Sequence, residues 1–332
     1  AMPAVSVVLP VFNGARTIAR AVRSILVQSF ADLELVVVDD GSTDATKAAL
    51  RPFDDGRLRV VSAAHRGVVA AANEATDLAT APLIARMDAD DFAHPRRIER
   101  QVRWLEEQRL DVVGCQVRIV DESGEPVPSL QRYQRWINTE TLDSERIAAL
   151  RFVEFPLVNP TILARREYFE LRFVDDDLPE DYDLMLRAAA AGFGFGKVPA
   201  TLLDWTDTAG RLTRTDQRYS TEAFMRCRRR HLLAGPLHGE SHVDLWGVGQ
   251  TGKPWLRWLQ GCGIVVRRGY DVHPRKVNRR IHGVLIGRPE DMPVADGTPL
   301  IVAVGAEEAR EMILPHLLEH GYALGGDAWF VA

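Results

Sequence analysis

The stretch VVVDDGSTDAT, from Val36 to Thr46, decides the fold of the first half of this chain. Its consecutive valines are typical of the end of a buried strand, predicted over Leu33–Val38, which the following Asp-Asp-Gly-Ser turn stops. Thr43 or Asp44 can then cap a helix that runs to about Leu50. The order of strand, acidic turn and helix indicates one half of a βαβ unit.

The same order is repeated on both sides of this stretch. Strand–helix alternation predicts right-handed βαβ units and a parallel sheet covered on both faces, so the expected fold class is α/β and Rossmann-like. Ligands of such sheets bind at the carboxyl ends of the strands. The predicted strands are Val5–Leu9, Leu33–Val38, Leu58–Ser62 and Leu83–Met87, and the predicted helices are Ala15–Gln28 and Val68–Leu78. Their carboxyl ends carry Pro10–Asn13, Asp39-Asp40 and Asp88–Asp91.

Further along the chain the pattern is looser between Glu122 and Asp177. Around that region we predict helices over Pro95–Gln108, Glu180–Ala191 and Ser220–Leu233, and strands over Val112–Val120 and Pro156–Ala164.

A second α/β pattern begins after the polar stretch Ala234–His242, which contains Gly and Pro and is predicted to be a linker. Apolar strands are expected over Val243–Trp246, Ile264–Arg267 and Leu300–Val304. The predicted organisation is therefore a domain over residues 1–235 followed by a smaller Rossmann-like domain over residues 236–332.

Composition narrows the class of protein. The 332 residues are 46% hydrophobic and 26% charged with a formal net charge of −5, which is globular and argues against a strongly basic nucleic-acid binder. The 3 cysteines lack metal-ligand spacing, which favours a reducing compartment, and we expect a cytoplasmic protein. No stretch approaches the roughly 20 apolar residues of a membrane span.

The sharpest chemical feature is Asp88-Ala89-Asp90 at a predicted strand end. Two carboxylates at this spacing can point to one side of a loop, where a hard divalent cation and a diphosphate would meet. Short acidic motifs recur by chance, and Asp91 before the next helix could simply be an N-cap. The motif alone leaves both interpretations open.

Taken together, four stretches resemble the family 2 glycosyltransferases of the GT-A fold over roughly residues 5–235. The resemblance implies a nucleotide-sugar donor, Mn²⁺ or Mg²⁺ as cofactor, and inversion at the anomeric carbon. The stretches, in chain order, are VSVVLPVFN from Val5, VVVDDGSTD from Val36, MDADD from Met87 and EDYD from Glu180.

The same resemblance implies roles for individual residues. Pro10 and Phe12 would line the nucleobase, Asp40 would accept a hydrogen bond from a uracil-like N–H, and Asp39 would support that turn. Asp88 would approach the ribose, and Asp90, together with Asp88, would hold the metal. The nucleotide-sugar set implied by the resemblance also includes Asn13, Arg66 and Gly67.

Asp181 would be the general base, taking the proton of the acceptor hydroxyl as that oxygen attacks the sugar. One base and one displacement give inversion without a covalent nucleophile. Its neighbours Glu180 and Asp183 could raise the pKa of Asp181 by like-charge repulsion. A helix-start acidic pair favoured by the helix dipole is the simpler alternative.

Departures from the family pattern affect the donor and acceptor sides. Ala72 stands where members often have Arg, so a diphosphate contact is missing or is supplied by Arg66 or Arg86. Asn159 stands where many members have His. The QRYQRW stretch from Gln131 does not match the Q-x-x-R-W motif of processive synthases, so we expect a non-processive enzyme.

Two basic segments have open interpretations. Trp205–Arg218 is predicted to be a loop over the site in which Gly210, Arg211 and Arg214 could clamp the diphosphate, with solvated arginines as the alternative. The arginine-rich run from Arg226 lies on the helix over residues 220–233, which could touch anionic lipid at the inner face of the membrane or present a solvated face.

The second domain carries Gly247-x-Gly249-x-x-Gly252 between a strand and a helix, with Asp271 where a ribose-binding acid would lie. NAD, CoA or another nucleotide could bind there, or the glycines could serve strand–helix packing alone. A P-loop is excluded because Pro254 replaces the required Ser or Thr.

The leading hypothesis is an inverting, metal-dependent, non-processive glycosyltransferase. It would move a sugar from a nucleotide donor, with UDP expected, to a saccharide or lipid-linked acceptor of a surface glycan. The alternatives are a non-catalytic sugar-nucleotide sensor or scaffold built on the second domain, and an oxidoreductase run by that domain.

Overall fold

The computed structural model describes residues 2–210 and 212–332, so Arg211 lies outside the described residues. The chain divides into two compact units. Unit 1 runs from the N-terminus to Ser144 and from Pro156 to Phe224, and unit 2 comprises Glu145–Phe155 and Met225–Ala332. The predicted division between residues 235 and 236 stays a prediction.

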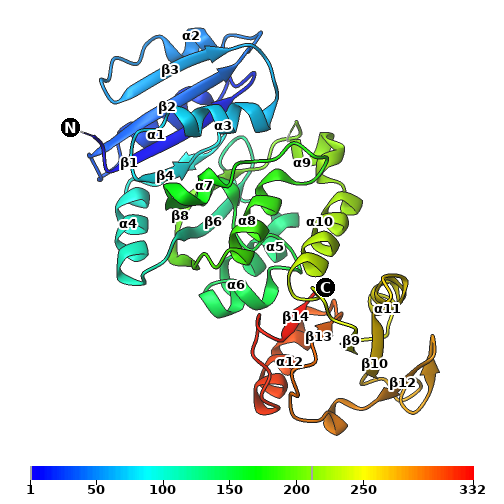
Figure 1. Ribbon diagram of the computed structural model, residues 1–332. Coiled ribbons are helices and arrows are strands. Elements are labelled where there is room, and N and C mark those ends of the chain that lie inside the picture. The colour runs from blue at the N-terminus through cyan, green and yellow to red at the C-terminus, as the bar shows by residue number, and fades with distance from the viewer. Residues whose placement is uncertain (1, 211) are drawn as a thin grey trace. The chain divides into compact units, whose positions relative to one another are not determined.

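Unit 1 is built on one mixed sheet (Figure 1) with the strand order β3-β2-β1-β4-β7-β6-β8-β5. β1 pairs in parallel with β2 and β4, and β2 pairs in parallel with β3, as the sequence predicts. Their carboxyl ends therefore meet at one edge of the sheet. The bounds of these strands are β1 Val5–Val11, β2 Leu33–Asp40, β3 Leu58–Ala63 and β4 Leu83–Arg86.

The other half of this sheet departs from the prediction of an all-parallel sheet. β7 pairs antiparallel with β4 and β6, and β5 pairs antiparallel with β8. The strand predicted over Pro156–Ala164 is short, because Asn159–Thr161 forms a 3-10 turn with Pro160 in its first positions. The bounds are β5 Phe92–Ala93, β6 Val112–Val120, β7 Leu163–Arg165 and β8 Phe195–Thr206.

Helices cover this sheet, and their amphipathic patterns explain where they lie. In α1 the residues Ile18, Val22 and Ile25 are fully buried, and α3 packs on β1 and β2. The helices through Ala190 are α1 Ile18–Leu26, α2 Thr46–Leu50, α3 Val68–Leu78, α4 Arg97–Glu107, α5 Gln131–Arg135, α6 Ser144–Leu150, α7 Arg166–Glu170 and α8 Glu180–Ala190. They are followed by α9 Leu212–Thr215 and α10 Thr221–Ala234; the residues of α10 from Met225 onward and those of α6 from Glu145 onward belong to unit 2.

A buried lysine ties the loosely patterned region to β8. Lys197 donates to the carbonyls of Ile137 and Pro156 and to Thr141 Oγ1, the last two at 2.9 and 2.7 Å. Burial lowers the pKa of Lys197 to about 7. The lysine acts as a structural anchor, because all three acceptors belong to the segment between β6 and β7.

Unit 2 is a separate, mostly parallel sheet with the order β11-β12-β10-β9-β13-β14. Leaving the short antiparallel β11 aside, this is the 3-2-1-4-5 order of dinucleotide-binding folds. The bounds are β9 His242–Trp246, β10 Val265–Tyr270, β11 Arg280–Ile281, β12 Val284–Gly287, β13 Leu300–Val302 and β14 Ala328–Phe330, with α11 Gly252–Gly261 and α12 Glu307–Glu319.

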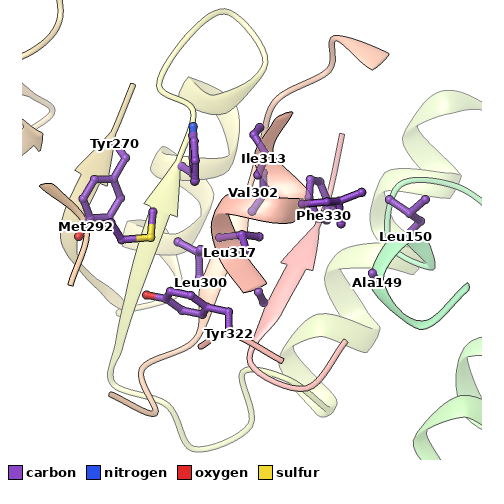
Figure 2. Packing of buried hydrophobic residues seen from close by; sticks show 13 residues of the cluster. Ala149, Leu150, Tyr270, Met292, Leu300, Val302, Ile313, Leu317, Tyr322 and Phe330 are labelled. Atoms are coloured by element: carbon purple, nitrogen blue, oxygen red, sulfur yellow. The ribbon is translucent and has the colours of Figure 1, made fainter. Parts of the chain in front are cut away.

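The core of unit 2 includes a segment from the middle of the chain. Ala149 and Leu150 of α6 are buried with Phe330 of β14 and Leu317 of α12 (Figure 2). Apolar burial stabilises by about 25 cal/mol per Å², so this contact explains why Glu145–Phe155 belongs to unit 2. The sequence pattern, read locally, could not assign it.

Among the described residues, no helix is long and apolar enough to cross a bilayer.

Two of the α10 arginines make contacts inside unit 2. Arg229 lies over the rings of Trp255 and Trp258 at 5.4 and 5.2 Å, and Arg228 donates to the carbonyl of Val153. The predicted contact of this helix with a membrane surface stays a prediction.

Candidate functional site

The loops that follow β1 and β2 are joined by side chains at the shared sheet edge. Asn13, with a φ of 53°, accepts at its Oδ1 from the backbone N–H of Thr43 at 2.8 Å and donates its own N–H to Ser42 Oγ at 2.8 Å. Asp44 accepts from the N–H of Ala15 at 3.0 Å. These bonds fix the position of Phe12, which leads out of β1.

Asp40 at the end of β2 holds the start of α3. Its 2 carboxylate oxygens accept from the backbone N–H groups of Arg66 and Gly67 at 2.8 and 2.9 Å. His65 Nδ1 lies 2.8 Å from Oδ2 of the same carboxylate. A carboxylate has about four acceptor positions, so one remains for a ligand N–H. Gly67 has a φ of 91°, which suits glycine at this turn.

An aromatic surface lies beside Asp40. Phe12 is 46% exposed and stacks on the ring of His65 at 4.1 Å between centroids. An exposed, preorganised aromatic ring at the carboxyl end of β1 is suited to a flat ligand. Asp39, in contrast, is fully buried, and its Oδ1 accepts from the N–H of Ser42 at 3.0 Å within the turn.

The acidic turn after β4 is held from two sides. Asp91 is buried and accepts from the N–H of Thr206 at 2.8 Å, so it anchors β8 instead of capping α4. The backbone carbonyl of Asp90 accepts from Thr206 Oγ1 and from Arg20 Nη2, each at 2.6 Å. Asp88 and Asp90 are themselves partly exposed.

The donor set of this turn fits a hard cation. Asp88 and Asp90 offer carboxylate oxygens from a turn whose backbone is fixed, and Mg²⁺ and Mn²⁺ prefer such ligands. The metal-binding assignment of these two residues stays a prediction.

Arginines near this turn differ sharply in their surroundings. Arg86 is 3% exposed and donates from Nη2 to Asp88 Oδ1 at 3.0 Å, while its Nε and Nη1 have no partner among the described residues. Arg66 pairs with Glu74 at an exposed position. Ala72 is buried in α3 and offers no polar atom. Of the two arginines considered in its place, Arg86 has unused donors.

Asp181 lies in the first turn of α8, which begins at Glu180. Its Oδ1 accepts from the N–H of Tyr182 at 2.8 Å. Burial, followed by the charge of Glu180, raises the pKa of Asp181 to about 8, while Arg86 acts in the opposite direction. Arg86 thus acts electrostatically on Asp181 and contacts Asp88 directly.

The two carboxylates that flank Asp181 have partners of their own. Glu180 is buried and accepts from the hydroxyl of Tyr219. Asp183 is buried and accepts from Arg187 Nε at 2.7 Å, an (i, i+4) pair within α8. Glu180 is therefore the neighbour that perturbs Asp181, and Asp183 is part of the helix framework.

The segment after β8 contains the predicted diphosphate clamp. Arg214 donates from Nη2 to Asp207 Oδ2 at 2.7 Å, so its guanidinium is held within the segment itself. A Cβ added at Gly210 would meet none of the described atoms within 4 Å, so this glycine faces open space. Arg211 lies outside the described residues, and the clamp stays a prediction.

In unit 2, two of the three motif glycines serve close packing. A Cβ on Gly252 would lie 1.8 Å from the carbonyl oxygen of Gly247, and a Cβ on Gly247 would lie 2.6 Å from that of Ala303. Gly249 differs, because its added Cβ would meet only Lys276 Nζ, at 3.3 Å. Gly247 and Gly252 are therefore required by the fold itself.

Asp271 is already engaged within unit 2. Its Oδ2 accepts from the N–H of Val248 at 3.1 Å and from Lys276 Nζ at 2.8 Å, and its Oδ1 accepts from the N–H of His273 at 2.9 Å. A ribose that used both oxygens would have to displace Lys276. Nucleotide binding at this loop stays a prediction.

Sequence reasoning missed several residues that shape the site. His65 is the stacking partner of Phe12, Thr206 and Arg20 fix the acidic turn, and Tyr219 holds Glu180. None of them lies in a recognisable motif, and each contact joins segments far apart in the chain.

A known protein family matches the first half of this chain. The family model described as "Glycosyl transferase family 2" matches residues 6–173, which include the ends of β1, β2 and β4. The chain is 38% identical over 127 residues to the putative glycosyltransferase EpsE of Bacillus subtilis, covering 37% of this chain and 46% of EpsE. It is 35% identical over 205 residues to the succinoglycan biosynthesis protein ExoU of Rhizobium meliloti, covering 57% of each. The chain thus spans about half the length of these curated relatives.

Solved structures share the fold. S. aureus TarS, crystallised with UDP-GlcNAc, aligns with a TM-score of 0.56 and 22% identity over 70% of this chain and 67% of that one. The mannosyltransferase PcManGT of Pyrobaculum calidifontis, in complex with GDP-Man and Mn²⁺, aligns with a TM-score of 0.50 and 22% identity over 72% of this chain and 64% of that one. This likeness confirms the GT-A fold that the sequence predicts.

Proposed function

The chain belongs to glycosyl transferase family 2, and from this premise we propose that it is an inverting, metal-dependent and non-processive glycosyltransferase. The donor would be a nucleotide sugar, with UDP as the expected nucleotide. The acceptor would be a saccharide or a lipid-linked intermediate of a surface glycan. Relatives named for glycosyl transfer and for succinoglycan biosynthesis support the reaction class and the type of product.

The nucleotide half of the donor would bind where β1 and β2 end. Phe12 and His65 supply a stacked aromatic surface for the base, and Asp40 retains one acceptor position for its N–H. Pro10 near the end of β1, together with Asn13 and Gly67 in the turns after β1 and before α3, would lie beside the base. Titrating uridine and its phosphates against Phe12→Ala tests the assignment, since the loss of stacking should weaken uridine itself by about tenfold.

Asp88 and Asp90 would hold the divalent metal and the diphosphate. When bound, Mn²⁺ or Mg²⁺ would offset the negative charge that develops on the departing nucleoside diphosphate. Arg86 would keep Asp88 oriented through its 3.0 Å hydrogen bond. Its unpartnered Nε and Nη1 make Arg86, not Arg66, the arginine best suited to offset the absence of Arg at position 72.

Asp181 would act as the general base. It would accept the proton of the acceptor hydroxyl while that oxygen forms the new bond to the anomeric carbon and the bond to the diphosphate breaks. A single displacement of this kind inverts the anomeric configuration. A base must be ionised to work, and Arg86 favours the ionised form of a carboxyl whose pKa is raised to about 8.

The observation that carries the proposal is the link between the two acidic centres. Arg86 donates to Asp88 in the turn after β4, and its charge opposes the rise in the pKa of Asp181 in α8, so one buried guanidinium acts on both centres. Calorimetric titration of UDP and GDP sugars, with Mn²⁺ and with a chelator, tests it in the wild type and in Asp90→Asn. Metal-dependent binding that is lost in the variant is the expected result, and metal-independent binding of equal strength would contradict it.

A further inference from the structure

Helix α8 carries the proposed base in a first turn that has no side-chain cap at its N-cap position. The N-cap position is Pro179, and it makes no side-chain capping bond. Uncapped first turns leave backbone N–H groups without partners and tend to fray. A base in such a turn needs support from elsewhere, because a displacement of about 1 Å in a reacting group can cost 10²-fold in rate.

Support comes from the short 3-10 turn Gln217–Tyr219. The hydroxyl of Tyr219 lies 2.7 and 2.8 Å from the two carboxylate oxygens of Glu180, which is 4% exposed. Burial raises the pKa of Tyr219 far above its ordinary value, so its hydroxyl keeps its proton and stays a donor.

A second charged contact strengthens the same attachment. Arg218 pairs with Asp175 at 2.6 Å, and its Nη1 lies 3.9 Å from Glu180 Oε2. The N–H of Arg218 donates to Asp216 Oδ1 at 2.9 Å, which fixes the turn that presents both side chains. The charged groups that face Glu180 are thus Arg218, Arg86 and Asp181.

We propose that Tyr219 is a positioning residue for sugar transfer: by donating to Glu180 it fixes the first turn of α8 and so the carboxylate of the adjacent Asp181. The inference rests on the proposed function and adds a residue that lies outside the family match at residues 6–173. Tyr219 does not touch a substrate in this scheme and acts only through Glu180.

The location of Tyr219 also connects the base to the segment after β8. Thr206 at the end of β8 holds the acidic turn through Asp90 and Asp91, and Tyr219 holds Glu180. Thr206 and Tyr219 are therefore attached to the proposed metal site and to the proposed base, respectively.

The test compares Tyr219→Phe, Glu180→Gln and Glu180→Ala with the matched control Tyr322→Phe. Tyr322 is a buried tyrosine of unit 2, and its variant also loses a single hydroxyl. Hydrolysis of UDP-glucose, UDP-GlcNAc and GDP-mannose with Mn²⁺, in which water takes the sugar and the nucleoside diphosphate leaves, gives kcat. Calorimetry gives the donor Kd, and thermal unfolding gives Tm.

We expect Tyr219→Phe to lower kcat about tenfold while the donor Kd changes less than about twofold. Glu180→Gln should retain more activity than Glu180→Ala, because its amide oxygen still accepts from Tyr219. Tyr322→Phe should leave kcat unchanged. An unchanged kcat in Tyr219→Phe, or an equal loss in kcat and donor affinity, would overturn the inference.

Failure of the proposed function gives a different result. In that case the wild type itself releases no nucleoside diphosphate from any of the three donors. A wild type that turns over a donor, combined with a Tyr219→Phe variant that matches it, rejects only the role of Tyr219. An inactive Glu180→Gln with an active Tyr219→Phe would likewise reject it, since Glu180 would then act directly.

Discussion

Two regions of this chain place an acid at the same position of the same architecture. Asp40 is the last residue of β2 and Asp271 follows β10, and each strand is parallel to a central strand that carries a loop beside the acid. Each carboxylate accepts from backbone N–H groups and has a basic partner, His65 for Asp40 and Lys276 for Asp271. The strand-end acids alone therefore do not distinguish the two units.

The difference lies on the other side of each central strand. β4 is followed by Met87 and the acidic turn from Asp88 to Asp91, whereas β13 is followed by Ala303, Val304 and Gly305. In the proposed scheme, unit 1 would hold a metal and a diphosphate at the edge where unit 2 has only apolar and small residues. The same parallel strand order provides both edges, so the side chains at the second strand end would decide the chemistry.

Among these predictions, removal of the proposed base in unit 1 is expected to have the largest effect on activity. Asp181→Asn is expected to reduce transfer about 10³-fold, because no other group takes the proton of the acceptor hydroxyl. Donor binding should stay within about twofold, measured by calorimetry with Mn²⁺. Asp54→Asn changes an exposed aspartate after α2 and serves as the control. Robust transfer in Asp181→Asn would mean that another group is the base.

Removal of a carboxylate from the acidic turn should have the next largest effect. Asp90→Asn is expected to weaken Mn²⁺-dependent binding of a nucleotide sugar about 10²-fold, since the amide is a poorer ligand for a hard cation. Uridine without phosphates should bind the variant as it binds the wild type. Equal losses for uridine and for the nucleotide sugar would point to a damaged fold and not to a lost metal ligand.

The sequence predicts one half of the unit 1 sheet better than the other half. Apolar runs predict β1, β2 and β3, and α3 is predicted at its observed bounds, Val68–Leu78. Strands buried on both faces have a continuous apolar pattern that is visible locally. On the other side of the sheet, β6 is predicted at its observed bounds, Val112–Val120, whereas β5 and β8 lack this signal.

β8 shows why the remainder escapes prediction. It contains Gly196, Lys197 and Pro199, and its pairing with β6 shifts register twice near Gln116. Bulges of this kind break the alternation on which strand prediction relies. The residues that complete the site cannot be predicted for a related reason. Tyr219 contacts Glu180 only in the folded arrangement of α8 and β8, which lie between them in the chain.

Glycine substitutions test whether the loop after β9 in unit 2 serves packing alone or also binds a ligand. Gly252→Ala should destabilise the protein by about 3 kcal/mol or more, because its Cβ would lie 1.8 Å from a backbone oxygen. Gly249→Ala should cost much less, since the flexible end of Lys276 can move. Thermal unfolding measures both. Titration of NAD and UDP into the wild type and into the folded Gly249→Ala variant then tests whether a ligand approaches this loop. Binding by the wild type that is lost in the variant would indicate a nucleotide site.

The last prediction concerns how the ionisation of Asp181 changes the stability of the folded protein with pH. The pKa of Asp181 is raised from 3.8 to about 8, so the folded protein binds a proton there that the unfolded chain releases. The contribution of this group to stability is present at low pH and is lost as the pH rises toward 8. Asp181→Asn does not titrate, and its Tm should exceed that of the wild type by an amount that grows from pH 5 to pH 9.

This pH dependence separates the charge effect from a simple packing change. A substitution that only repacks the first turn of α8 would shift Tm by the same amount at every pH. Because Glu180 and Asp181 interact, the transition belongs to the pair, and Glu180→Gln should reduce the slope as well. Asp54→Asn should run parallel to the wild type throughout. A Tm difference for Asp181→Asn that stays constant with pH would mean that this carboxyl is not protonated in the folded protein, and that proximity to Glu180 is not costly at the proposed active site.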